Sequence, residues 1–284
     1  MQLMKFTLII VFITMSGLPL FSQESEEKKP EYGWKKEVVG NLNFTQNKFD
    51  NWSQGGEDSW SWQLDINAKF ENDQEKYNWT NTGKFSFGQT KVGDADSRKA
   101  ADEIKLESVY TYKLGEHVNP YAAVTGRTQI TDGYQYTDTS KFAISNFLDP
   151  GYFTQSAGVG YKPNDNIKTR LGAALKETVA DKYPFADDPT TDRIEKSRVE
   201  FGAESVTDVE FKVSENILFK SKLELFSTFE AINEVDANWD NLISAKVSEY
   251  INVSFNLNLF YDRDISKSRQ LKQTLAVGLT YSFL

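Results

Sequence analysis

Charged side chains recur at every second position of several extended segments, where together they would form one polar face. Strands direct successive side chains to opposite faces, so apolar residues between these charges share the other face. Their mixed signs allow two kinds of chemistry: ion-pair networks that fill a narrow enclosed lumen, or a hydrophilic pore whose charges tune permeation. The candidates are Asp65, Lys69, Lys84, Glu103, Lys105, Glu107, Arg127, Lys168, Arg170, Lys176, Glu200, Glu204, Lys220, Lys222, Glu224 and Lys272.

Residues for nucleophilic or metal chemistry are scarce. The chain has no cysteine, which excludes disulfides, thiolate metal sites and a lipid-modified cysteine. Its single histidine, His117, falls in a predicted short turn, so a Ser-His-Asp arrangement at an outer face is not expected. A group of acidic residues could offer oxygens to calcium, but its spacing matches no EF-hand loop: Asp181, Asp187, Asp188 and Asp192. We predict no enzyme, no metal site and no cofactor.

A second candidate site is the loop F-D-N-W-S-Q-G-G-E-D-S at residues 49–59. It can be a tight loop in which glycines supply positive φ, the asparagine caps the turn and the tryptophan anchors the loop on a rim. It can also be a contact surface for a ligand or partner, because loops on rigid scaffolds often carry recognition. The residues concerned are Phe49, Asn51, Trp52, Gly55 and Gly56.

Segments in which apolar and polar residues alternate must position both the charged residues and the first loop. In residues 59–70, apolar and polar residues alternate without exception. Most such segments are longer than ordinary strands and match the ~9 to 11 residues with which a tilted strand crosses a bilayer. The pattern predicts twelve strands, at residues 37–46, 59–71, 76–89, 102–114, 119–131, 151–162, 166–178, 196–212, 214–229, 237–248, 250–262 and 270–283.

The connections between these segments alternate between short and long. The short ones lie at 72–75, 115–118, 163–165, 213–215 and 248–249, and the long ones at 47–58, 90–101, 132–150, 179–195, 230–236 and 263–269. Outer-membrane barrels combine short periplasmic turns, long outer loops and an even strand number. The predicted fold is therefore an all-β, transmembrane, antiparallel up-and-down β-barrel with both termini in the periplasm.

Composition agrees with a barrel. Aromatic residues make up 14% of the chain, as expected for girdles at two membrane interfaces. The net charge of −9 argues against nucleic acid as a partner. We expect outer-membrane lipids and lipopolysaccharide as surroundings, and the sequence leaves the oligomeric state open.

The two ends of the chain predict export and insertion. Lys5 followed by the apolar residues 6–21 predicts a signal peptide over 1–22, then a periplasmic segment at 23–36 and a barrel at 37–284. The last strand carries an unbroken apolar row, which we expect to face lipid and to be read by the barrel-assembly machinery: Leu275, Val277, Leu279, Tyr281 and Phe283.

The chain resembles an uncharacterised outer-membrane β-barrel family of the Bacteroidota, a domain of unknown function. The shared features are the early Trp34, N-W-x-x-G-G in the first loop, S-x-S at Ser59 and Ser61, and K-Q-T-L-x-V-G-L-x-Y-x-F near the C-terminus. The resemblance extends from Trp34 to the end of the chain. It implies an outer-membrane barrel in a Gram-negative cell and no particular activity, and the final Leu284 departs from the aromatic residue that often ends such barrels.

Three functions are left in order of preference. The first is a porin-like passive pore or transport barrel for small polar solutes. The second is a non-conducting structural or partner-binding barrel that acts through its outer loops. The third, a lipid-modifying or proteolytic barrel enzyme, is disfavoured by the position of His117.

Overall fold

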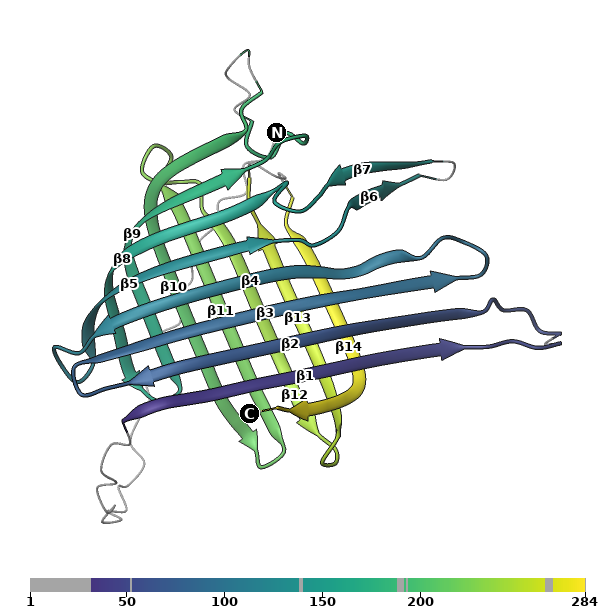
Figure 1. Cartoon of the computed structure of the whole chain (residues 1–284), viewed down its shortest axis with the longest axis horizontal. Helices are drawn as coiled ribbons and strands as arrows, with labels where there is room; N and C mark the ends of the chain where they lie inside the picture. Colours follow the sequence, from purple (N-terminus) through teal and green to yellow (C-terminus); the bar gives the residue numbers. More distant parts are fainter. Residues whose placement is uncertain are drawn as a thin grey trace, which may run out of the picture. The chain divides into compact units, whose positions relative to one another are not determined.

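The computed structural model shows a closed antiparallel barrel of twelve strands and a separate two-stranded sheet (Figure 1). It describes residues 32–51, 53–137, 140–187, 192, 194–263 and 268–283. In these residues no helix is long and apolar enough to cross a membrane. The barrel strands are β1 (Gly33–Asn47), β2 (Ser59–Asp73), β3 (Tyr77–Val92), β4 (Arg98–Tyr112), β5 (Val118–Thr128), β8 (Gly151–Asn164), β9 (Ile167–Val179), β10 (Ser197–Ser214), β11 (Ile217–Thr228), β12 (Asp236–Lys246), β13 (Ile251–Tyr261) and β14 (Gln270–Ser282).

Each barrel strand pairs with its neighbour in sequence, and β1 pairs with β14 to close the sheet. The predicted all-β fold with twelve antiparallel strands is confirmed. Antiparallel order places the short turns at one end of the barrel, and there β1 begins and β14 ends, since Val39 lies opposite Ser282. The longer connections lie at the other end.

Strand limits differ from the prediction at a few points. β1 begins at Gly33 rather than at residue 37, and β3 and β4 continue to Val92 and from Arg98, so the connection between them is shorter than expected. The connection at 132–150, predicted as a loop, contains the hairpin β6 (Gly133–Tyr136) and β7 (Lys141–Ser145). These strands are too short for an alternating pattern to show. The predicted signal peptide and most of the segment at 23–36 lie outside the described residues.

The outer face of the barrel is apolar. Leu275 and Phe283 of the terminal row are 73% and 60% exposed, and aromatic side chains meet near the ends of the strands. Trp34 of β1 lies 6.0 Å from Trp79 of β3 between ring centroids, while Trp62 and Phe87 lie 5.7 Å apart nearer the long loops. Other exposed apolar side chains occur on strands all round the barrel, including Leu42, Phe44, Leu106, Val124, Val159, Leu171, Phe201, Ile243, Phe255 and Val277.

Two glycines let β8 and β9 approach closely. Gly158 lies directly opposite Gly172. A Cβ on Gly172 would run into the backbone of Ala157 and come 2.7 Å from Oη of Tyr121, whose buried ring belongs to β5. The pair therefore makes room for the tyrosine.

Substituting Gly172→Ala should destabilise the barrel by about 1–3 kcal/mol, because overpacking against backbone atoms cannot be relieved by a side-chain rotation. Gly160→Ala is the matched control on β8, since its Cβ would meet nothing nearer than Asn119 O at 3.5 Å. Urea unfolding of the two variants, followed by tryptophan fluorescence, measures the difference. Equal midpoints for both variants would contradict this account of the glycine pair.

Candidate functional site: the barrel lumen

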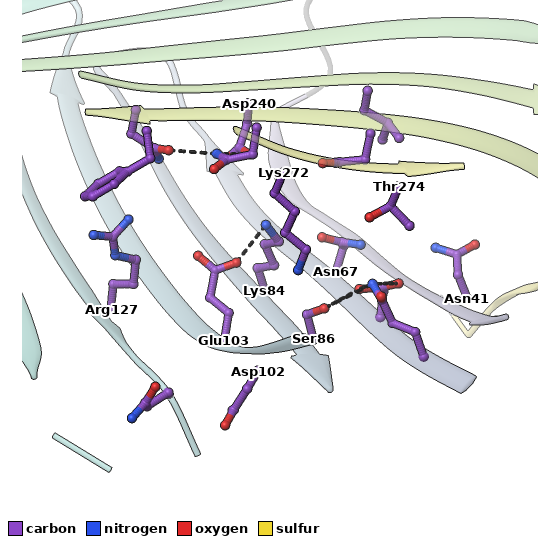
Figure 2. A pocket seen from close by; sticks show the side chains of 18 of the residues that line it. Asn41, Asn67, Lys84, Ser86, Asp102, Glu103, Arg127, Asp240, Lys272 and Thr274 are labelled. Atoms are coloured by element: carbon purple, nitrogen blue, oxygen red, sulfur yellow. Dashed lines mark hydrogen bonds and ion pairs between the residues drawn. The ribbon is translucent and has the colours of Figure 1, made fainter. Parts of the chain in front are cut away.

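One side of the lumen is a cavity of about 510 Å³ lined by β1 to β5 and β12 to β14. Its wall is rich in side-chain amides (Figure 2). Each amide offers both hydrogen-bond donors and an acceptor without net charge, so the wall suits polar, uncharged solutes. The amide residues are Asn41, Asn43, Gln63, Asn67, Gln129, Asn238, Asn252, Asn256, Asn258 and Gln270.

This cavity extends along the barrel. β13 spans Ile251–Tyr261, and every second residue from Asn252 to Phe260 lines the cavity. Near the short turns the wall includes Ser244, and near the long loops it includes Gln270 and residues of the connections. A single space therefore follows a whole strand from one end to the other.

Charges in the cavity wall are balanced by close partners. Lys84 Nζ lies 2.8 Å from a carboxylate oxygen of Glu103, and Asp65 accepts a 2.6 Å hydrogen bond from the hydroxyl of Ser86 (Figure 2). Asp240 accepts a 2.6 Å hydrogen bond from the amide of Asn258. The wall thus presents paired positive and negative charges together with neutral hydrogen-bonding groups, rather than an excess of charge of one sign.

Aromatic rings border the cavity beside a cation. The guanidinium carbon of Arg127 lies 5.0 Å from the ring centroid of Tyr152 and 5.2 Å from that of Phe260. Both rings line the cavity. Lys272 also points into this space from β14 (Figure 2).

The other side of the lumen is crossed by ion pairs. Lys105 of β4 lies 2.6 Å from Glu224 of β11, and Glu107 of β4 pairs with both Lys222 of β11 and Arg170 of β9. Four strands separate β4 from β11 in the sheet, so these contacts bridge the interior rather than run along the wall. They fill this half of the lumen with side chains.

A second bridge lies nearer the long loops. Lys176 of β9 is 2.6 Å from Asp236 at the start of β12 and 3.1 Å from Asp262, which follows β13. A space of about 110 Å³ lies between the two bridges, lined among others by Lys105, Lys176 and Glu224. The bridged half is narrow, and the open space of the barrel is on the amide-lined side.

The remaining predicted charges lie at the edges of these groups. Lys69 pairs with Glu71 at 2.9 Å, Lys220 with Glu210 at 3.2 Å, and Glu200 with Arg198 at 3.0 Å. Glu204 is buried 3.9 Å from Arg170, and Lys168 is an exposed residue of β9. The structure thus brings most of the predicted charges together in pairs, while only Asp65, Lys84, Glu103, Arg127 and Lys272 line the large cavity.

Sequence reasoning missed the amides and Asp240. It sought charges as the mark of a polar face, whereas β12 and β13 mark that face mainly with asparagine and serine. The signal is present in I-N-V-S-F-N-L-N-L-F, where every second residue from Asn252 to Asn258 is polar. An alternating amide row predicts a lumen face as well as an alternating charge row does.

The first loop is held together by its own residues. The carboxylate of Asp58 accepts hydrogen bonds from Lys48 Nζ and, at 2.8 Å, from the backbone N–H of Phe49. These two bonds hold the pKa of Asp58 below its usual value, and the bond from Lys48 has the larger effect. The ring of Phe49 lies where a Cβ on Gly56 would stand, so glycine is required there.

Backbone geometry accounts for the other motif residues. Gly55 and Gly56 have φ of +84° and +139°, and Asn51 has φ of +53°, a conformation that asparagine tolerates. Trp52 lies outside the described residues. These features fit a tight loop, and a binding role for the motif stays a prediction.

His117 lies in the turn between β4 and β5, where its Nδ1 is 3.1 Å from the carbonyl oxygen of Lys162 and its ring packs edge-on against Tyr161. It lines neither lumen space. In the acidic loop, Asp181 pairs with Lys196. Asp188 lies outside the described residues. Within the ranges that the structure describes, no group of His, Cys, Asp or Glu could hold a metal ion.

Comparison with known proteins gives a family model and several barrels. A family described as "Protein of unknown function (DUF3078)" matches residues 44–134, which run from the end of β1 to the start of β6. No curated protein matches the sequence.

Solved structures that resemble the chain do so at low identity. The translocator domain of the autotransporter NalP from Neisseria meningitidis is 8% identical over 90% of each chain, with a TM-score of 0.41. An outer-membrane channel from Pseudomonas putida is 12% identical over 92% of this chain and 98% of that one, with a TM-score of 0.41. The porin NanC is 8% identical over 86% and 97%, with a TM-score of 0.39.

Proposed function

We propose that this protein is an outer-membrane barrel through which small, polar, uncharged solutes pass passively. The observation that carries the proposal is the amide-lined cavity that follows β13 from Asn252 to Phe260. A barrel whose only task was structural would gain nothing from leaving this half open, because the opposite half shows how ion pairs can fill it. Paired charges and abundant amides favour neutral solutes over ions of one sign.

The outer face supports insertion in a membrane. Exposed apolar side chains surround the barrel, and such a surface is costly in water. On β1 the outward aromatic residues Trp34 and Phe44 are separated by a length that matches the ~9 to 11 residues of a membrane-crossing strand. The short-turn end would face the periplasm and the long loops the outside, with lipopolysaccharide around them and the terminal row engaging the assembly machinery.

Reconstitution of the purified barrel tests the proposal. In planar bilayers it should give stable unitary current steps, and in liposomes it should admit small sugars or amides faster than protein-free vesicles do. Absence of both current steps and solute entry, in a preparation shown to be folded by its β-sheet circular dichroism, would rule out a pore.

A partner-binding role is the second candidate, favoured by the β6–β7 hairpin, which projects from the long-loop end in Figure 1. Its exposed side chains include Phe142 and Ile144, while Lys141 lies 5.3 Å from the ring of Tyr134 and Arg98 4.4 Å from that of Tyr136. Replacing Phe142 and Ile144 by serine should leave conductance unchanged if the barrel is a pore. If the variant still conducts but no longer supports the role of the protein in the cell, partner binding by the hairpin would be the function.

A further inference from the structure

The seam between β1 and β14 is paired over only part of its length. Pairing runs from Val39↔Ser282 to Asn43↔Gly278 and stops there. Every other neighbouring pair in the barrel is matched over a longer stretch, and β1 with β2 is matched from Gly33 to Asn47. In Figure 1 the end of β14 (yellow, beside the C label) bends to run alongside β1, while the earlier part of β14 runs in a clearly different direction. The barrel is therefore closed near the short-turn end of this seam and unpaired beyond it.

On the side away from the seam, both strands remain paired with their other neighbours along the same residues. Phe44 to Asn47 stay matched to β2, from Phe44↔Trp62 to Asn47↔Ser59. On β14 the matching with β13 continues from Val277↔Val253 to Gln270↔Phe260. The gap in pairing thus belongs to the seam and not to frayed strand ends.

Backbone chemistry makes such a gap costly in a dry membrane. A strand edge presents unpaired N–H and C=O groups, and each of these left unsatisfied in hydrocarbon costs several kcal/mol. Water must therefore reach them, and the lumen cavity is the source at hand. Asn43 on one edge lines that cavity, as do Lys272, Thr274 and Ala276 on the other.

The outward side of the same seam is apolar. Phe44 is 60% exposed on β1, and Leu275 and Val277 are strongly exposed on β14. A molecule lying across the seam would meet amides and water on its lumen side and apolar side chains and lipid on its outer side. Such surroundings suit an amphipathic molecule with a neutral hydrogen-bonding head and an alkyl or aryl tail.

We propose that the unpaired part of the β1–β14 seam is a lateral portal through which amphipathic molecules pass between the lumen cavity and the membrane. The proposal rests on the proposed pore function and names a further substrate class for it. Head groups would use the cavity, and tails would leave between Phe44 and Leu275.

Cysteine pairs test whether the seam is open, and the cysteine-free chain allows this without background. If the observed register continued, Thr45 would lie opposite Ala276, so Thr45→Cys with Ala276→Cys would form a disulfide in a closed seam. The control is Asn41→Cys with Thr280→Cys, whose native side chains are joined by a 2.6 Å hydrogen bond across the paired part. In lipid nanodiscs under mild oxidation the control should cross-link and the test pair should not.

Transport through the seam is then measured in liposomes that carry the Thr45→Cys, Ala276→Cys barrel. A bifunctional thiol reagent should lower the transfer of a fluorescent octyl glycoside into the vesicle membrane at least fivefold. Entry of an uncharged polar solute into the same vesicles separately reports whether the pore works. Because Ala276 lines the cavity, this entry should fall, but by less than glycoside transfer, and it should stay faster than in protein-free vesicles. Spontaneous disulfide formation in the test pair, cross-links between two chains, or glycoside transfer unaffected by the reagent would each overturn the portal.

Discussion

Glu107→Gln is expected to destabilise the barrel by about 3–5 kcal/mol, because removing one member of a buried ionic group leaves its partners uncompensated. The Glu107 carboxylate meets Arg170 on one side and Lys222 on the other, and its own side chain is 6% exposed. Glutamine keeps the shape but removes the charge that balances both cations. Urea unfolding of the refolded barrel in detergent measures the loss.

The matched control is Glu210→Gln, which removes an acid of the same type from the exposed pair with Lys220. Exposed pairs contribute about 0–1 kcal/mol, so this variant should unfold near the wild type. Replacing Glu107, Arg170 and Lys222 together by apolar residues of similar volume should recover much of the stability lost by Glu107→Gln. Equal losses for Glu107→Gln and Glu210→Gln would show that the ion pairs across the lumen do not hold the strands together.

The barrel was predictable because its main physical signal is local. Alternation in residues 59–70 fixes which face of β2 meets the lumen, and short turns between long alternating segments fix antiparallel neighbours. The hairpin β6–β7 was not predicted because its strands are too short to show a clear alternation of apolar and polar residues. The early start of β1 was not predicted because residues 33–36 do not alternate cleanly between apolar and polar side chains.

The site was less predictable, because it depends on distances between strands far apart in sequence. Alternation indicates that Lys105 and Glu224 face inward, but not that they meet across the barrel at 2.6 Å. The sequence therefore could not decide between a filled lumen and an open one. The structure contains both: ion pairs fill the side of β4, β9 and β11, and amides line a cavity on the opposite side.

The second large effect concerns that cavity. Ser254→Cys, placed in the wall midway along β13, should allow a water-soluble methanethiosulfonate reagent to reduce unitary conductance by roughly half or more, since pore conductance depends on the groups that line the narrow path. The substitution replaces a hydroxyl by a thiol of similar size, so the unmodified variant should conduct like the wild type. Single-channel recording before and after reagent addition measures the change.

Val253→Cys is the control on the same strand, because successive residues of a strand point to opposite faces and Val253 does not line the cavity. Its conductance should not respond to the reagent, and neither should that of the wild type, which has no cysteine to modify. Complete modification of Ser254→Cys, shown by mass spectrometry, with an unchanged current would mean that ions cross the barrel elsewhere. The ion-pair half would then have to be the path, and Glu107→Gln would alter conductance instead. The two substitutions together therefore decide which half of the lumen conducts.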